Sequence, residues 1–116
     1  MGVENCVFCR IVAGEIPAEV VHRDEEVLAF QDLSPQAPVH ILIIPRRHVP
    51  SLAELDDDDG DLAGRLLLVA RQVARDQGVE ANGFRLVANT GADGGQSVDH
   101  LHFHLLGGRS LGWPPG

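Results

Sequence analysis

The stretch that decides the fold is His100-Leu101-His102-Phe103-His104-Leu105-Leu106, in which three histidines alternate with apolar residues. Successive side chains of a β-strand point to opposite faces of the sheet. The alternation therefore predicts a strand with all three imidazoles on one face and apolar side chains on the other. Imidazole titrates near neutral pH, so such a row can attack, shuttle protons or bind metal. A purely structural row is disfavoured, because buried ring nitrogens need partners.

The composition is that of one globular domain. The chain has 116 residues, of which 44% are hydrophobic and 22% charged, and its formal net charge is −8. An acidic surface argues against binding of a nucleic-acid backbone. The sequence has no apolar run of about 20 residues that could span a membrane. Its N-terminus lacks the basic and apolar blocks of a secretory signal, which favours the cytoplasm.

Hydrophobic periodicity predicts short strands and two helices around the histidine row. The strands are expected at 19–22, 27–31, 39–44 and 83–89, and the helices at 6–13 and 61–77. Leu62, Leu66, Val69 and Val73 form an apolar stripe on the longer helix. Leu67 and its neighbours widen the stripe, so this helix is expected to pack on the sheet with one side and on a second copy with the other.

A glycine-rich loop at 90–97 leads directly into the histidine row. Glycines let backbone N–H groups approach an anion closely. The loop places Ser97 beside the imidazoles, while Asp32 and Asn89 end two of the predicted strands. This set suits a nucleotide, with a histidine attacking phosphorus to form a labile phospho-histidine. Metal-dependent hydrolysis by the histidines is the alternative hypothesis.

Cys6 and Cys9 have the spacing of half a zinc site. With two cysteines in the chain, histidine or carboxylate would have to supply the other ligands. A disulfide and two inert thiols are the alternatives, although a reducing compartment disfavours the disulfide.

The sequence resembles the histidine triad superfamily, whose signature is His-φ-His-φ-His-φ-φ with φ apolar. The resemblance covers nearly the whole chain, and within the superfamily the chain is similar to the histidine triad nucleotide-binding (HINT) branch. It includes Gly14-Glu15-Ile16-Pro17-Ala18, Ser34-Pro35-Gln36-Ala37-Pro38, Gly94-Gly95-Gln96-Ser97-Val98 and the ending Trp113-Pro114-Pro115-Gly116.

The resemblance implies an α+β fold, with an antiparallel sheet of about five strands, one long helix and one short helix. It implies one HIT domain over 1–116 and a homodimer whose sheet continues across the interface. The C-terminal tail, 107–116, would contribute Trp113 to the leaving-group side of the partner's site.

The implied activity is hydrolysis of purine nucleoside 5′-phosphoramidates of the AMP or GMP type, without a required cofactor. His102 would attack phosphorus, and His100, His104 and His40 would orient it and manage protons. Residues implied to hold the phosphate are Gly95, Gln96, Ser97 and Asn89. Residues implied to hold the nucleoside are Asp32, Phe8, Ile11, Ile16, Phe30 and Leu33. A regulatory nucleotide-binding module with incidental catalysis and a dinucleoside polyphosphate hydrolase remain alternatives.

Two features depart from the usual pattern of this branch. Asp99 stands before the triad, where an aromatic residue is usual. The cysteine pair occurs in only some members of the superfamily. The resemblance to those members implies a structural zinc site in which His48 and His100 complete the ligands. In that case His100 would be a metal ligand rather than part of the proton network.

Overall fold

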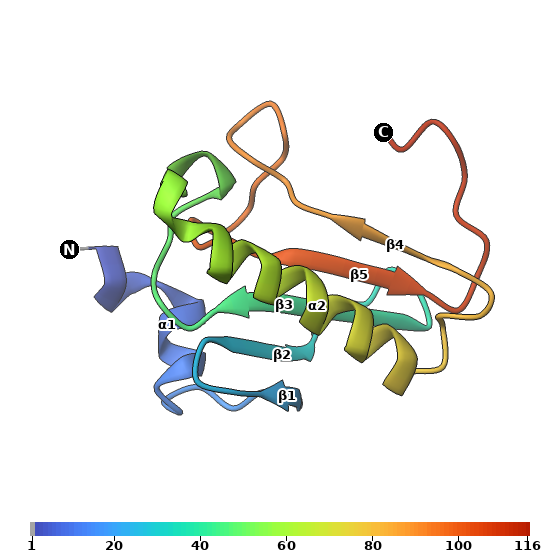
Figure 1. The fold of residues 1–116 in the computed structure, drawn as a ribbon, viewed down its shortest axis with the longest axis horizontal. Coiled ribbons are helices and arrows are strands. Elements are labelled where there is room, and N and C mark those ends of the chain that lie inside the picture. Colours follow the sequence, from blue (N-terminus) through green and yellow to red (C-terminus); the bar gives the residue numbers. More distant parts are fainter. Residues whose placement is uncertain (1) are drawn as a thin grey trace.

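The computed structural model describes residues 2–116 and contains one five-stranded antiparallel sheet in the order β1-β2-β3-β5-β4 (Figure 1). The strands are β1 (Val20–Arg23), β2 (Val27–Gln31), β3 (Val39–Pro45), β4 (Phe84–Val87) and β5 (Phe103–Gly107). The α-helices are α1 (Val7–Val12) and α2 (Gly60–Asp76), and the 3-10 helices are η1 (Gly2–Asn5), η2 (Leu52–Glu54) and η3 (Asp57–Asp59). The α+β architecture with one long and one short helix is confirmed. Within 2–116, no helix is long and apolar enough to cross a bilayer.

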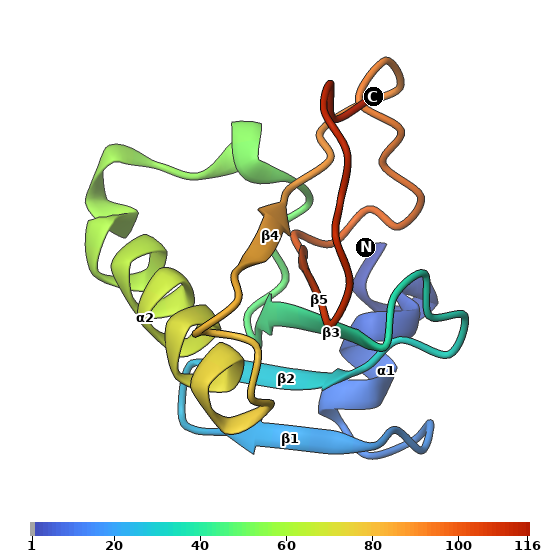
Figure 2. The ribbon, with the colours of Figure 1, turned by 90° about the vertical axis from the view of Figure 1, so that its right-hand side faces the viewer.

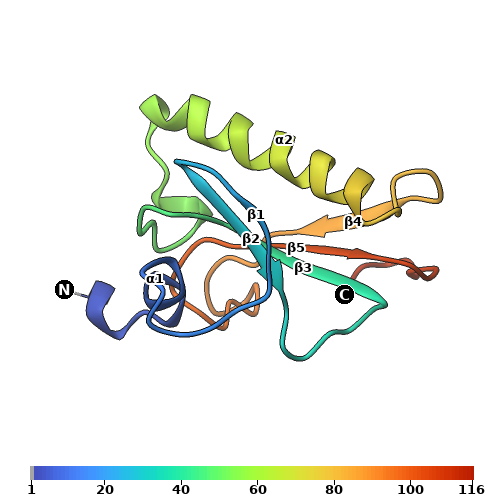
Figure 3. The same ribbon diagram turned by 90° about the horizontal axis from the view of Figure 1, so that it is seen from below.

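The sheet separates the two α-helices, which lie on opposite faces (Figures 2 and 3). Alternation along β3 explains this arrangement, because Ile41 and Ile43 belong to the cluster under α2, while Leu42 and Ile44 belong to the cluster beside α1. Both faces of the central strands are therefore buried, which accounts for the near-continuous apolar run of β3. The 90–97 loop, drawn in orange, lies on the α1 side of the sheet.

The histidine row obeys the predicted alternation, although its hydrogen-bonded strand begins later than predicted. Leu101 and Leu105 are buried in the cluster under α2, so the histidines face the α1 side. The ladder of β5 begins at Phe103, and His100 and His102 precede it. Leu101 N–H donates instead to the Val49 carbonyl at 2.7 Å, outside the regular sheet. Side-chain alternation thus continues past the end of the ladder.

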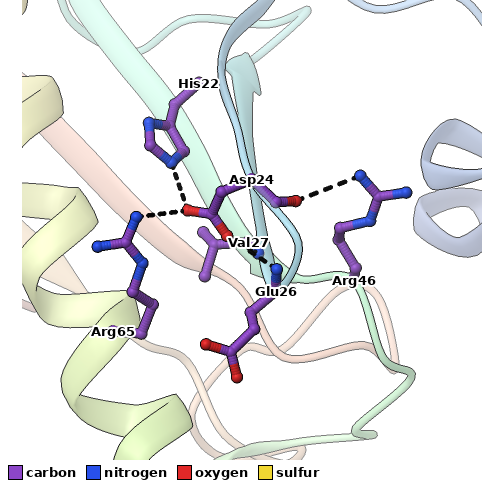
Figure 4. Close-up of polar contacts among 6 residues, drawn as sticks. All are labelled: His22, Asp24, Glu26, Val27, Arg46 and Arg65. Atoms are coloured by element: carbon purple, nitrogen blue, oxygen red, sulfur yellow. Dashed lines mark hydrogen bonds and ion pairs between the residues drawn. The ribbon is translucent and has the colours of Figure 1, made fainter.

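A carboxylate in the β1–β2 hairpin joins that hairpin to α2 (Figure 4). Asp24 Oδ2 accepts hydrogen bonds from His22 Nε2 at 2.6 Å and Arg65 Nη2 at 2.8 Å. Its Oδ1 accepts from the backbone N–H groups of Glu26 and Val27, at 2.8 and 2.9 Å. Since Arg65 lies on α2, this one side chain fixes both the turn and the position of the long helix over β1.

Candidate active site

A pocket of about 240 Å³ opens on the α1 face of the sheet. All six residues expected to hold a nucleoside line it, namely Phe8, Ile11, Ile16, Phe30, Asp32 and Leu33. The Phe8 and Phe30 rings meet edge to face, with centroids 5.6 Å apart, and Leu33 is exposed at the rim. Ser97, His102 and His104 line the pocket as well. The pocket is therefore largely apolar, with imidazoles and a hydroxyl among its polar groups.

The hydrogen bond of His102 fixes the tautomer of its neutral ring. Its Nδ1 lies 2.8 Å from the His100 carbonyl oxygen. A carbonyl accepts only, so Nδ1 carries the proton and Nε2 keeps its lone pair. The ring is 3% exposed and contacts Phe8 edge to face, with centroids 5.1 Å apart. The backbone and one aromatic side chain thus hold the His102 ring, of which little is exposed to solvent.

His40 and His104 form a hydrogen-bonded pair with a defined polarity. The backbone N–H of Gln36 donates to His40 Nδ1 at 3.0 Å, so the His40 proton lies on Nε2. That proton is donated to His104 Nδ1 at 2.9 Å. His104 therefore carries its own proton on Nε2, and its ring centroid lies 5.0 Å from that of His102. The pair places an N–H donor near the His102 ring.

Burial keeps this pair neutral. It lowers the pKa of His40 below the ordinary 6.5, and the Asp32 carboxylate partly opposes the shift, with Asp32 Oδ2 3.4 Å from His40 Nε2. Burial also lowers the pKa of His104, helped by His102 and His40 and opposed by Asp32. Both rings are consequently uncharged at neutral pH, as the assigned chain of donors and acceptors requires.

The glycine-rich loop is closed by its own amide side chains. Asn89 Nδ2 donates to the Gly94 carbonyl at 2.7 Å, and Gln96 Oε1 accepts from Gly91 N–H at 3.0 Å. Gln96 Nε2 donates to the Pro50 and Val98 carbonyls. Of the four residues expected to hold phosphate, Ser97 is part of the pocket wall. The side chains of Asn89 and Gln96 shape the loop, and Gly95 adopts φ +76° within it.

Cys6, Cys9, His48 and His100 form a second cluster behind the pocket, with their ligand atoms within 4.8 Å of one another. His100 Nε2 donates to the Pro45 carbonyl at 2.8 Å, so its Nδ1 lone pair faces Cys6 Sγ at 3.3 Å and Cys9 Sγ at 3.5 Å. His48 Nδ1 lies 3.2 Å from Cys9 Sγ. Tetrahedral zinc with its usual bond lengths sets sulfur–nitrogen separations of about 3.5 Å. The four residues therefore fit a zinc ion.

The protonation expected of this cluster without metal agrees with its hydrogen bonds. Burial raises the pKa of the Cys9 thiol to about 11, with a further contribution from Cys6. Burial also lowers the pKa of His100 to about 4; the hydrogen bond to Pro45 opposes this, and His48 and His102 add to it. The site thus consists of a protonated Cys9 thiol beside a neutral His100 imidazole, and a metal ion would displace thiol protons on binding.

Asp32, His40 and His104 form another group with ligand atoms within 4.8 Å. There the facing imidazole nitrogens already form a donor–acceptor pair. We therefore interpret this group as the proton network rather than as a metal site.

Other residues named from the sequence lie outside the pocket wall. Trp113 is 84% exposed on the tail, where Arg85 Nη2 donates to the Gly112 carbonyl at 2.6 Å. Asp99 is also exposed, so its carboxylate is solvated and leaves the core packing undisturbed. It lines a separate hollow beside His48 that shares Ser97 with the pocket.

Sequence analysis missed several contributors to the site. Leu42 and Val98 line the pocket, and the Gln36 backbone N–H sets the His40 tautomer. Leu42 could have been found from its β3 alternation with His40, which places both on one face. A backbone donor leaves no such signal, because every residue except proline has one.

A row of imidazoles that faces an apolar pocket on one side of an antiparallel sheet is typical of an active site whose chemistry depends on histidine. Comparison with known proteins shows the family to which this chain belongs. The HIT domain model matches residues 13–111, and the chain belongs to this family. An uncharacterised HIT-like protein of Synechocystis is 50% identical over 113 residues, which cover 97% of this chain and 98% of that protein.

Solved structures agree with this assignment. A HIT family hydrolase from Legionella pneumophila superposes with a TM-score of 0.95 at 50% identity, covering 97% of this chain and 100% of that one. A histidine triad protein from Clostridium difficile gives a TM-score of 0.90 at 44% identity, covering 93% and 94%.

Proposed function

We propose that the protein is a hydrolase that cleaves the phosphorus–nitrogen bond of purine nucleoside 5′-phosphoramidates. The observation that carries this proposal is the unprotonated Nε2 of His102 in an apolar pocket that also contains Asp32 and Ser97. The family assignment and the name of the hydrolase from Legionella support the reaction class.

The pocket residues fit distinct parts of such a substrate. The rings of Phe8 and Phe30 would contact the base, and Asp32 would accept hydrogen bonds from the ribose hydroxyls. Ser97 and the backbone at Gly95 would hold the phosphate oxygens without a cationic side chain. The pocket would thereby bring the phosphorus to His102.

The proposed reaction has two steps. His102 Nε2 forms a bond to phosphorus as the phosphorus–nitrogen bond to the amine breaks, and the departing amine takes a proton from solvent, so that a nucleotidyl-histidine replaces the phosphoramidate. Water then attacks the phosphorus, releases the nucleoside monophosphate and regenerates His102. His104 would direct its Nε2–H at the transferring group, with His40 keeping it in that tautomer. The His100 carbonyl would hold His102 Nδ1–H throughout.

We propose a structural zinc ion held by Cys6, Cys9, His48 and His100. When bound, zinc supplies a cross-link rather than a reactive species. His100 then has three tasks, since its Nδ1 is a ligand, its Nε2 donates to Pro45 and its carbonyl orients His102. The ligands would attach α1, which carries Phe8, to the segment that carries the nucleophile.

We propose a homodimer in which Trp113 approaches the partner's leaving-group site. Leu67 and Leu68 on α2 are 52% and 48% exposed, which gives the helix a second apolar face that a partner subunit could cover. We propose a reducing compartment such as the cytoplasm, because Cys6 and Cys9 form no disulfide with each other.

The decisive experiment measures hydrolysis of adenosine and guanosine 5′-phosphoramidates by wild type, His102→Ala and His102→Asn. Loss of the nucleophile should lower kcat at least about 10³-fold while AMP binding stays within about tenfold. His22→Ala is the control for loss of an imidazole on β1, outside the pocket, and rates are compared per folded molecule because His22 bonds to Asp24. Acid-labile adenylylation of wild type should disappear in both His102 variants.

Other outcomes separate the alternatives. Turnover by His102→Ala near that of wild type would remove His102 as the nucleophile. Faster cleavage of a diadenosine polyphosphate than of any phosphoramidate would indicate a dinucleoside polyphosphate hydrolase. Nucleotide binding without turnover of either substrate would indicate a regulatory module.

A further inference from the structure

We propose that Arg109, at the root of the C-terminal tail, is a positioning residue that sets the polarity of the His40–His104 pair. It acts through the loop at 33–38 and touches neither substrate nor imidazole. Its placement stands on geometry alone, whereas its consequence for turnover rests on the proposed function.

Three hydrogen bonds, joined through the Gln36 backbone and the His40 ring, connect Arg109 to His104. Arg109 Nη2 donates to the Gln36 carbonyl at 2.9 Å. On the other side of the Gln36 Cα, the Gln36 N–H donates to His40 Nδ1 at 3.0 Å. His40 Nε2 then donates to His104 Nδ1 at 2.9 Å. Arg109 thus holds the residue whose N–H selects the tautomer of the pair.

The root of the tail also packs against this loop. Gly108 has φ +89°, and a Cβ placed on it would come within 2.9 Å of Pro38 Cβ. Glycine is required there on both counts, since other residues are strained at that φ and would push Pro38 away. The close approach of Gly108 brings Arg109 to the Gln36 carbonyl. The tail and the loop therefore form one packed unit.

Two groups favour the proton on His40 Nε2, namely the Gln36 N–H at Nδ1 and the Asp32 carboxylate, whose Oδ2 lies 3.4 Å from Nε2. Of the two, the Gln36 N–H is the one that Arg109 holds. With that donor in place, the His40 proton is on Nε2 and the His104 proton on its own Nε2, directed away from His40. If the donor moves away, His40 can hold its proton on Nδ1 and become an acceptor at Nε2. His104 must then donate from Nδ1, which leaves its Nε2 without a proton. The two arrangements present opposite groups near His102.

Arg85 provides a matched control, because it lies on β4 and contacts the same tail. It donates from β4 to the Gly112 carbonyl at 2.6 Å, four residues before the C-terminus. Removing Arg85 loosens the end of the tail but leaves the Arg109–Gln36 bond in place. A comparison of the two variants separates control of the loop from a general effect of tail order.

The test measures histidine tautomers by long-range ¹⁵N–¹H spectra of the free protein in wild type, Arg109→Ala, Arg109→Lys and Arg85→Ala. Arg109→Ala should move His40 toward its Nδ1–H tautomer, and Arg109→Lys should restore part of the wild-type population, because lysine keeps one charged donor. Arg85→Ala should retain the wild-type tautomer. With phosphoramidate substrate, Arg109→Ala should lower kcat roughly tenfold with KM within about twofold.

An unchanged His40 tautomer in Arg109→Ala overturns the proposal, as does an equal change in Arg85→Ala. A raised KM with unchanged kcat overturns the link to the proton network. If wild type hydrolyses no phosphoramidate, the proposed activity fails, while the tautomer spectra still decide the role of Arg109.

Discussion

The two faces of the sheet differ in what their side chains require. Under α2, aliphatic residues such as Leu66, Val69 and Leu105 pack without polar partners. On the α1 side, five imidazoles and two thiols share the face with Phe8 and Phe30. The 17-residue α2 covers its face, whereas the six-residue α1 leaves room for a pocket. The fold therefore separates a face that stabilises from a face that can react.

Hydrogen bonding explains how the reactive face tolerates its polar groups. Burying an unpaired ring nitrogen costs free energy, so most of these nitrogens have partners. His100 uses Pro45 and the thiols, His102 uses the His100 carbonyl, and His40 uses Gln36 and His104. Among these four histidines within 2–116, Nε2 of His102 and Nε2 of His104 have no hydrogen-bond partner. Both histidines line the pocket, where substrate would supply the missing partners.

The largest effect on stability is expected from truncation on the α2 face. Leu66 is 1% exposed, and Leu66→Ala should lower the free energy of unfolding by about 2–5 kcal/mol through lost burial and a cavity. Denaturant unfolding measures the loss, with the exposed Arg71→Ala on the same helix as control. Turnover per folded molecule should stay within about twofold. A loss below about 1 kcal/mol, or a large change in turnover, would contradict the division between the faces.

Zinc would give the reactive face a stabilising role of its own. Zinc at about 100 times its dissociation constant should add about 2.7 kcal/mol to the free energy of unfolding. Metal analysis and thermal unfolding with and without chelator should show bound zinc and a lower Tm after its removal.

Cys9→Ser is the control for the zinc prediction. It should bind less zinc and respond little to chelator, because a thiolate ligand is lost. Equal chelator effects in Cys9→Ser and wild type, or zinc-free wild type that chelator leaves unchanged, would contradict the predicted site.

A smaller, pH-dependent effect is expected at Asp24. Burial alone would raise the pKa of this carboxyl, but hydrogen bonds from His22, Glu26, Arg65 and Val27 outweigh it and hold the pKa well below the ordinary 3.8. The carboxylate therefore stabilises the fold above pH 3.8, and this contribution is lost as the pH falls through the folded-state pKa.

Asp24→Asn tests this contribution. It should lower the free energy of unfolding by about 1–2 kcal/mol at neutral pH and flatten the loss of stability below about pH 4. Unfolding curves over this pH range measure both changes. Asp58→Asn, in the exposed part of η3, should leave the acid limb as in wild type. A steep acid limb retained in Asp24→Asn would show that other groups control it.

Much of the framework was predictable because it depends on residue type. The apolar pattern placed β2 at 27–31, and alternation placed Leu101 and Leu105 opposite the histidines. The resemblance implied that His40 acts with the histidine row, and the β3–β5 pairing brings His40 within hydrogen-bond distance of His104. The start of β5 was predicted too early, because the Leu101 N–H bonds to Val49 in an irregular segment.

By itself the sequence determined three properties: the sheet buried on both faces, the placement of three histidines on one face, and the family. The first two follow from the spacing and polarity of the side chains, and the family follows from the motifs that the chain shares with it. Only the tertiary structure decided which nitrogen of each histidine carries the proton. The partners that decide it are the carbonyls of His100 and Pro45 and the N–H of Gln36. Backbone groups are nearly the same in every residue, so no sequence pattern identifies them before the fold brings them together.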